Sequence, residues 1–583
     1  MIKKIRVLPG ILAALVTLTS IGINSSAQAQ SAASKELDSL VTTIWEYESK
    51  LQQSRPADIS PAALASQHEQ FARYLKQINQ VPVETLSEEE KITLLMQRYR
   101  LKNEIDQYEY GAYKVPLTSE YGFHSALATL PQSTRFSSIE DYRNYLSQLE
   151  RVATTIDQNI AYMQQGLDEG YTQPKAVLQG YEKSVTPMLV KRTEESVFYQ
   201  PFHTLPAQLE ATAIAPLRQQ AKQLIEQQII PAYQRYYDFL VSQYIPGARD
   251  SIAATDWPDG KAYYQNRIAY YTTTEMTASE IHQLGLKEVK RIRAQMQTIV
   301  DELKFDGDID QFIHFLRTDP QFYATSATAL LKQAAYIAKQ ADASLPALFE
   351  KLPSVPYGVA PVPDDIAPKY TTGRYIHPAN DAQPGYYWVN TYALDKRPLY
   401  ALAALTLHEA VPGHHLQISL ADEMENLPAV RRQTYISAFG EGWGLYAEFL
   451  GIEAGIYTTA YDNFGRLSYE MWRACRLVVD TGMHMFGWSR QQAIDYMMKN
   501  TALSEHNITT EVDRYISWPA QALSYKIGEI KIKQLRRQAE QALGDEFDVR
   551  EFHTAVLAHG SVPLFVLEQN INTFIDNKKT GNL

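Results

Sequence analysis

Residues 408–415 read His-Glu-Ala-Val-Pro-Gly-His-His, and this short segment constrains the chain more than any other feature of its sequence. On a helix, two imidazoles four residues apart lie on one face and can bind a single zinc ion. The fourth residue after His408 is Pro412, however, so the usual spacing is broken. The next imidazoles along the chain are His414 and His415.

Pro412 and Gly413 predict an interruption of this helix. An ideal helix turns about 100° per residue, so His414 would lie about 120° around the axis from His408. Pro412 cannot donate the hydrogen bond that the carbonyl of His408 would accept, and Gly413 permits backbone angles closed to other residues. We therefore expect a π-bulge or a break at Pro412-Gly413 that brings His414 beside His408. His415 returns to nearly the same face two turns away and remains the alternative ligand.

Glu409 gives the segment a catalytic character, because a Glu beside the first His can accept a proton from water. Three His and one Glu within eight residues, in a chain with 13 His, favour a metal site over isolated histidines that cap carbonyls. A structural zinc site usually closes with four protein ligands and needs no base, whereas a catalytic site keeps one position open. We expect one Zn²⁺ per chain, held by three protein ligands, with Glu409 as general base.

Glu441 is the strongest candidate for the third ligand. Glycines on both sides of Glu441 would let its backbone approach the metal-binding helix closely. Glu448, seven residues later, shares a helix face with Glu441 and is expected to hold a ligand His in its tautomer. The alternative for Glu441 is a buried ion pair with Arg473 or Arg476.

Apolar residues recur at three- and four-residue spacing along most of the chain, which is typical of amphipathic helices. This pattern predicts helices over residues 34–53, 87–107, 138–165, 206–244 and 277–303. Residues 345–391 are rich in Pro, Gly and Tyr, and the aromatic, β-branched segment Gly385–Thr391 indicates a strand. We expect a mainly α protein with a small β element beside the metal-binding helix. The edge of the strand at residues 386–391 could pair with an extended peptide, or the strand could be purely structural.

The first residues have the pattern of a secretory signal. A basic start is followed by an apolar run over residues 11–23 and by Ala27-Gln28-Ala29, a small-x-small cleavage pattern. We expect residues 1–29 to be removed near Ala29 and residues 30–583 to be periplasmic or secreted, without stable membrane insertion. The alternative is a signal anchor that stays attached. Because no Cys follows the apolar run closely, a lipid anchor is not expected.

The net charge argues against polyanionic partners, and the cysteine content excludes an intramolecular disulfide. Removal of three basic residues with the signal changes the net charge from −11 to −14, which argues against nucleic acid or an anionic membrane as partner. The only cysteine is Cys475, so no intramolecular disulfide can form. It lies in an apolar helical stretch and is expected to be an inert core thiol.

Four motifs resemble a bacterial family known only as domain of unknown function 885. They are His408-Glu-Ala-Val-Pro-Gly-His-His-Leu-Gln417, Glu441-Gly-Trp-Gly-Leu-Tyr-Ala-Glu448, Arg476-Leu-Val-Val-Asp480-Thr-Gly-Met-His484 and Trp518-Pro-Ala-Gln521-Ala-Leu-Ser-Tyr525-Lys526-Ile-Gly528. The resemblance covers nearly the whole chain after the signal and is specific from about Tyr386 onward.

That family is similar in fold to helical zinc metallopeptidases related to Taq carboxypeptidase and neurolysin. The resemblance implies one large domain with two helical halves, about residues 30–344 and 345–583, flanking a deep channel with zinc at its floor. In these enzymes a Gly often precedes the second ligand His, which favours His414 over His415. Their third ligand follows one short helix-loop-helix downstream, and Glu441 fits that position. The two extra residues before His414 depart from their pattern.

Further residues are expected to contact the substrate. The resemblance implies Tyr525 as the donor to the oxyanion, because related peptidases place a Tyr over the zinc. Arg514 and Lys526 could bind a substrate carboxylate, or could form ion pairs instead. Asn390 could contact the substrate backbone, or belong to a purely structural strand. His484 could support the site from behind, or be a core histidine.

These features together predict a zinc-dependent hydrolase, a metallopeptidase that cleaves short peptides. Exopeptidase action, from the carboxyl end, follows from the resemblance and the possible carboxylate-binding residues. The alternatives are a zinc hydrolase of a non-peptide amide or ester, and a non-catalytic binding protein with a vestigial metal site. The sequence predicts no oligomeric state.

Overall fold

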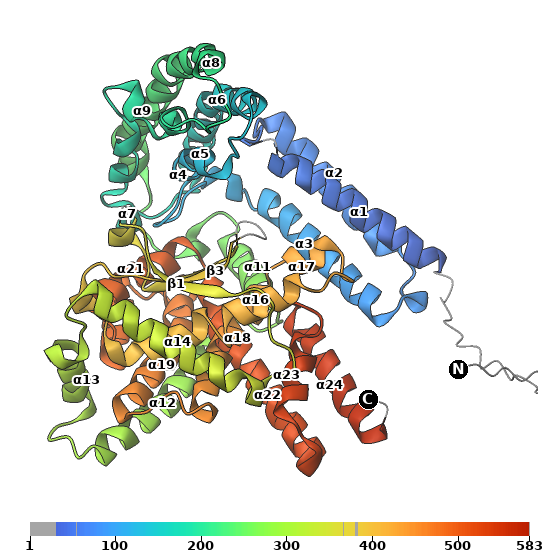
Figure 1. Cartoon of the computed structure of the whole chain (residues 1–583), viewed down its shortest axis with the longest axis vertical. Coiled ribbons are helices and arrows are strands. Elements are labelled where there is room, and N and C mark those ends of the chain that lie inside the picture. Colours follow the sequence, from blue (N-terminus) through green and yellow to red (C-terminus); the bar gives the residue numbers. More distant parts are fainter. Residues whose placement is uncertain (1–30, 54, 365, 379–382, 582–583) are drawn as a thin grey trace, which may run out of the picture.

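The computed structural model describes residues 31–53, 55–364, 366–378 and 383–581. It confirms a mainly helical protein with one small sheet (Figure 1). The expected signal at residues 1–29 lies outside the described residues. Every helix within them is too short or too polar to cross a membrane.

Helix starts are set by side chains that bond to free backbone N–H groups. Ser87, Ser138 and Thr277 each precede a long helix and form a capping box with the acidic residue three positions on. The helices expected from residues 34, 87, 138 and 277 are thus present. The helix expected over residues 206–244 begins later, at Ala211, and contains two wider turns, at Ile225–Ile229 and Leu240–Tyr244.

The N-terminal part, coloured blue to green in Figure 1, has two groups of helices. Three long helices form one group: α1 (Ala32–Gln53), α2 (Pro61–Gln80) and α3 (Glu88–Glu109). The second group lies above the rest of the molecule and contains α4 (Phe123–Ala128), α5 (Leu130–Ser133), α6 (Ile139–Glu169), α7 (Lys175–Leu178), α8 (Ala211–Leu224), α9 (Ile230–Phe239) and α10 (Ile245–Gly247).

The lower part of the molecule carries His408, His414 and Glu441, the residues predicted to bind a metal ion. Its first helices are α11 (Gly260–Thr272), α12 (Ala278–Glu302), α13 (Ile309–Thr318) and α14 (Ala327–Leu348). Those beyond the sheet are α15 (Leu402–Glu409), α16 (His414–Asp422), α17 (Ala429–Gln433), α18 (Ser437–Glu453), α19 (Ala460–Met485), α20 (Arg490–Asn500), α21 (Glu505–Ser517), α22 (Ser524–Leu543), α23 (Val549–Leu557) and α24 (Leu564–Thr580). Since α12 packs along α19, the chain before residue 345 contributes to this part as well.

The sheet has three strands, β1 (Tyr357–Pro361), β2 (Gly373–Ile376) and β3 (Gly385–Val389), in the order β1-β3-β2. β3 pairs parallel to β1 and antiparallel to β2. The strand expected at Gly385–Thr391 is therefore present as β3. The expectation that its edge could bind a peptide is wrong, because both edges of β3 are occupied and β2 is the strand that borders the site.

Candidate metal centre

The helical region around residues 408–415, predicted to bind a metal ion, forms two helices rather than one bulged helix. α15 ends at Glu409 and α16 begins at His414, so the break includes Pro412 and Gly413, as the sequence predicts. The indole Nε1 of Trp443 donates to the carbonyl of Pro412 at 2.8 Å and fixes the connection. A Cβ on Gly413 would lie 1.9 Å from the carbonyl oxygen of His408, so only glycine fits there.

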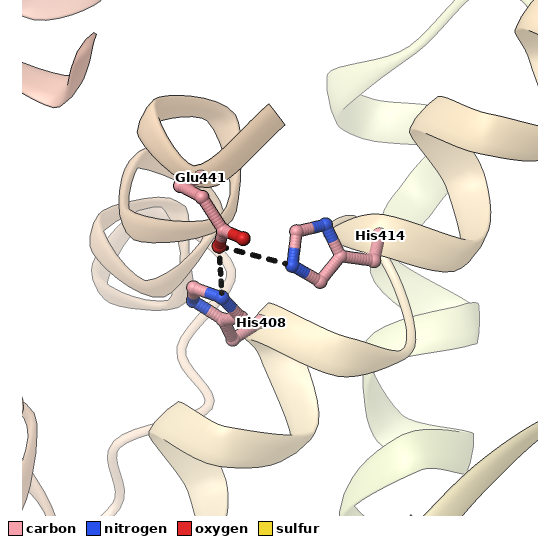
Figure 2. A group of neighbouring side chains, drawn as sticks. All are labelled: His408, His414 and Glu441. Carbon is pink, nitrogen blue, oxygen red and sulfur yellow. Dashed lines mark ion pairs between the residues drawn. The ribbon is translucent and has the colours of Figure 1, made fainter. Parts of the chain in front are cut away.

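The break brings His408 and His414 together with Glu441 of α18 (Figure 2). Oε2 of Glu441 lies 3.5 Å from Nε2 of His408 and 3.4 Å from Nε2 of His414. Ligand atoms in a tetrahedral zinc site, each about 2.0–2.1 Å from the metal, are about 3.3 Å apart. The three side chains therefore have the chemistry and the spacing to hold one zinc ion with a fourth position free.

Gly444 allows α18 to approach α15 this closely. A Cβ at Gly444 would lie 2.5–2.9 Å from three atoms of the His408 ring. Any larger residue would push the ring away from the position in which Nε2 faces Glu441. The close approach expected from glycines beside Glu441 is therefore made by Gly444, whereas a Cβ at Gly440 would meet Tyr435 and one at Gly442 would meet Gly528 of α22.

Glu448 orients His408 from behind. Its Oε1 lies 2.9 Å from Nδ1 of His408 and 3.2 Å from Nη2 of Arg473. A carboxylate on Nδ1 fixes the tautomer that turns Nε2 toward a metal. Burial alone would lower the pKa of His408, but Glu441 and Glu448 raise it to about 9.

Glu441 does not form the alternative ion pair with an arginine. Arg473 pairs with Glu448, and Arg476 pairs with Glu511 at 2.9 Å. Burial would raise the pKa of Glu441, but His414 and His408 hold it well below its usual range.

Glu409 borders the cavity beside the three side chains. Its Oε2 accepts a hydrogen bond from the backbone N–H of Tyr375 in β2 at 2.8 Å. This bond fixes one carboxylate oxygen and gives the edge strand a direct role in orienting the expected base.

His415 lies apart from the group formed by His408, His414 and Glu441. Its Nδ1 is 3.0 Å from the hydroxyl of Tyr375 and 3.3 Å from that of Ser419. Burial lowers its pKa to about 4, so the ring is neutral. Among the described residues, the structure thus groups His414 rather than His415 with His408 and Glu441.

A cavity of about 610 Å³ opens over these residues. Tyr525 and Arg514 line it, as the sequence analysis expects of substrate-contacting residues. It is also lined by residues from the N-terminal part, from α11 and from β2 that lie outside the predicted metal-binding motifs: Tyr99, Glu120, Tyr121, Tyr270, Tyr271 and Arg374.

Two residues of the lower part, Tyr435 and Arg476, line the cavity although the sequence does not predict that they do. Burial has the largest effect on the pKa of Tyr435 and the Glu441 carboxylate the next largest. Both raise this pKa well above its usual range. Tyr435 precedes α18 in a stretch without a recognisable pattern, and the sequence predicts only an ion-pair role for Arg476.

Three expected residues do not line the cavity. Asn390 is buried and donates to the carbonyls of Ala367, Tyr370 and Thr371, so it supports the loop before β2 instead of contacting substrate.

Lys526 is buried in an ion-pair network with Glu288, Glu470 and Glu529, which leaves it no access to a substrate carboxylate. His484 is a core histidine: its Nδ1 accepts from the backbone N–H of Ala254 at 2.9 Å, and its Nε2 donates to the carbonyl of Tyr515 at 3.0 Å.

Comparison with known proteins finds relatives without a stated activity. A model of the family described as "Bacterial protein of unknown function (DUF885)" matches residues 43–571. The crystal structure of a "putative lipoprotein from Colwellia psychrerythraea" is 28% identical and has a TM-score of 0.85, over 94% of this chain and 100% of that chain. A "putative lipoprotein of unknown function from Shewanella oneidensis" is 17% identical with a TM-score of 0.72, over 92% of this chain and 99% of that chain, which is a likeness of fold alone. No curated protein matches the sequence.

Proposed function

The chain belongs to the DUF885 family, and because that family has no known function, we propose from the site itself that the protein is a zinc-dependent metallopeptidase acting on short peptides. One observation carries the proposal: His408, His414 and Glu441 converge with zinc-ligand spacing beside a Glu that borders the same cavity. A purely structural zinc site would need neither the base nor the open side.

Zinc at such a site supplies Lewis-acid polarisation and makes water a stronger nucleophile at neutral pH. The residues of the chain perform the remaining work. Glu409, with Oε2 fixed by the backbone of β2, accepts the proton from the attacking water and passes it to the leaving amine. Tyr525 borders the cavity. Its hydroxyl is protonated, because burial and, next in size, the Glu441 carboxylate raise the pKa of Tyr525. It is the proposed donor to the oxyanion.

The cavity supports a peptide substrate of limited size. Its volume of about 610 Å³ lies in the range of small-molecule sites, which suits a few residues of an extended chain rather than a folded protein. Tyrosine and tryptophan side chains supply apolar walls with polar edges. The resemblance of the sequence motifs to those of helical zinc metallopeptidases also supports this proposal.

We place the mature protein outside the cytoplasm, because its first residues have the pattern of a secretory signal. The two similar structures are described as candidate lipoproteins of their own organisms. In this chain Cys475 is buried in α19, and burial raises the pKa of its thiol. We propose a periplasmic or secreted enzyme.

Metal content and peptide hydrolysis test the proposal together. Purified protein loaded with Zn²⁺ is expected to hold one ion per chain and to cleave members of a mixed peptide library, as measured by mass spectrometry. Glu409→Gln is expected to retain the ion and to lose at least about 100-fold of the activity, because general-base catalysis contributes about that much.

Glu425→Gln is the matched control. Glu425 lies in the loop after α16 and does not line the cavity, so this variant should keep both metal and activity. A protein that holds no stoichiometric zinc under metal-replete conditions would contradict the proposal. Bound zinc without cleavage of any peptide would point instead to another amide or ester substrate, or to a binding protein.

A further inference from the structure

Arg476 presents an unused hydrogen-bond donor at the wall of the cavity. Its guanidinium is buried, with the residue 3% exposed, and lines the cavity. Nε donates to the hydroxyl of Tyr515 at 2.8 Å and Nη2 donates to Glu511 at 2.9 Å. Nη1 has no partner among the described residues. A buried cationic donor left unpaired is costly unless a ligand completes its bonding.

Other arginines line the same cavity. Arg514 shares the Glu511 carboxylate with Arg476, at 3.4 Å, and also donates to Gln521 at 2.6 Å. Arg374 of β2 also lines the cavity and donates to the hydroxyl of Tyr121 at 3.3 Å.

The cavity is lined by four arginines and four carboxylates, the latter being Glu120, Glu409, Glu441 and Glu511. Arg476 and Arg514 share one of these carboxylates, Glu511. An anionic group of a ligand would complete the pairing of these two guanidinium groups.

This wall is separated from the metal-type residues by one aromatic ring. The guanidinium carbon of Arg476 lies 4.2 Å from the centre of the Tyr525 ring. After burial, the Glu441 carboxylate and the Arg476 guanidinium have the largest effects on the pKa of the Tyr525 hydroxyl, and they act in opposite directions. Tyr525 thus lies near both groups, and it lines the same cavity as Arg476, His408 and His414.

Neighbouring side chains and a loop of the N-terminal part hold Arg476 and Glu120 in place. Arg476 packs against the rings of Trp472 and Tyr515, at 4.5 Å and 5.5 Å from their centres. The backbone N–H of Ser119 donates to Oγ of Ser517 at 3.0 Å, and this bond holds the N-terminal loop that carries Glu120 against α21.

We propose that Arg476, together with Arg514, binds the free C-terminal carboxylate of a peptide, so that the enzyme cleaves near the carboxyl end of its substrate. This inference rests on the proposed function for its catalytic part and adds the substrate class. Arg476 and Arg514 are positioning residues that act on the terminal carboxylate, while the cleaved bond lies on the Glu409 side of Tyr525.

Matched peptides that differ only at the C-terminus test the inference on the wild-type protein. Each cleaved peptide is compared as free acid and as amide, with the N-terminus acetylated in both. The free acid is expected to have a kcat/KM at least about 100-fold higher, because the amide leaves the guanidinium unpaired. Equal rates for acid and amide would overturn the inference while leaving the proposed peptidase intact.

Arg476→Gln tests the assigned residue. It is expected to lower kcat/KM for the free acid about 100-fold, mainly through KM, and to abolish the preference for acid over amide. Arg476→Lys should restore part of the preference. Arg490→Gln, at an ion pair with Asp513 that does not line the cavity, is the control and should keep the preference.

Binding provides a readout that does not depend on catalysis. Calorimetry with Zn²⁺-loaded Glu409→Gln protein and an acetylated tripeptide should detect the free acid and give at least about 100-fold weaker binding of the amide. If no peptide is cleaved, the proposed function fails, and selective binding of the acid would still support the carboxylate site. Equal binding of both would overturn it, even if Arg476→Gln fails to fold.

Discussion

Three imidazoles within eight residues have three different environments. His408 uses both ring nitrogens, one toward Glu448 and one toward Glu441. His414 directs Nε2 at Glu441, and its Nδ1 has no partner within the described part of the chain. His415 is held neutral by burial against Tyr375. The difference arises from the break in the helix, which turns His414 toward α18 and leaves His415 facing the sheet.

The variants His414→Ala and His415→Ala should therefore differ in metal binding. Loss of His414 removes a ligand atom and should weaken zinc binding by more than the about 10–100-fold typical of an outer-shell change. Loss of His415 should change zinc affinity by less than about 10-fold and act mainly on activity through Tyr375. Competition with a chromophoric chelator measures both affinities. Equal zinc retention in the two variants would refute this assignment.

At the scale of elements, α18 depends on glycine to reach α15. Gly444→Ala introduces a Cβ within 2.9 Å of three His408 ring atoms, so either the helix or the ring must move. We expect a loss of about 1–3 kcal/mol in unfolding free energy and weaker zinc binding. Chemical denaturation and chelator competition measure these.

Ile452→Ala, at a half-exposed position of the same helix, provides the comparison and should cost less than about 1 kcal/mol. If Gly444→Ala binds zinc as tightly as wild type, the close approach is not required for the site.

The site was predictable where backbone chemistry decides it. Pro412 and Gly413 can only interrupt a helix, and the break places His414. The glycines of α18 likewise predict a close helix approach at Glu441. The outcome for Lys526 and Asn390 was not predictable, because each depends on partners distant in sequence. Lys526 meets Glu288 and Glu470, and no local pattern records that α12, α19 and α22 adjoin.

In the fold, too, local features were predictable and contacts between distant segments were not. Amphipathic spacing and capping residues locate the long helices, since both act within a few turns. The position of β3 in the middle of its sheet depends on β1 and β2, whose short segments carry little signal. The substrate wall is the extreme case, because Glu120 and Arg476 come from opposite parts of the chain.

Over the whole molecule, Asp480 is a buried carboxyl that joins several elements. It accepts from the hydroxyl of Tyr264 in α11 at 2.6 Å and from the backbone N–H of Ala520 at 3.2 Å. Burial raises its pKa to about 7, although both bonds act in the opposite direction. An unfolded Asp titrates near about 3.9, so between these values the folded state binds more protons.

This shift predicts stability that falls with rising pH. The contribution of Asp480 should be most favourable below about pH 4 and should decline through about pH 7, by up to about 4 kcal/mol. Urea unfolding of the metal-free protein at pH 5 and pH 7.5 measures the decline. Asp480→Asn should flatten it, whereas the exposed control Asp495→Asn should not. An unchanged pH dependence in Asp480→Asn would exclude Asp480 as its source.

The bond between Ser119 and Ser517 joins residues 398 positions apart in the sequence, and this has a consequence for when the enzyme becomes competent. The proposed metal ligands lie within residues 408–441, so they can assemble before α21 and α22 are in place. The wall that receives the substrate cannot, since it needs a loop from near the start and α21 and α22 from near the end. Contacts this distant form late in folding. Under the proposed function, a partly folded or truncated chain would therefore bind zinc without a place to align a peptide, and hydrolysis would begin only once the entire molecule has closed around the cavity.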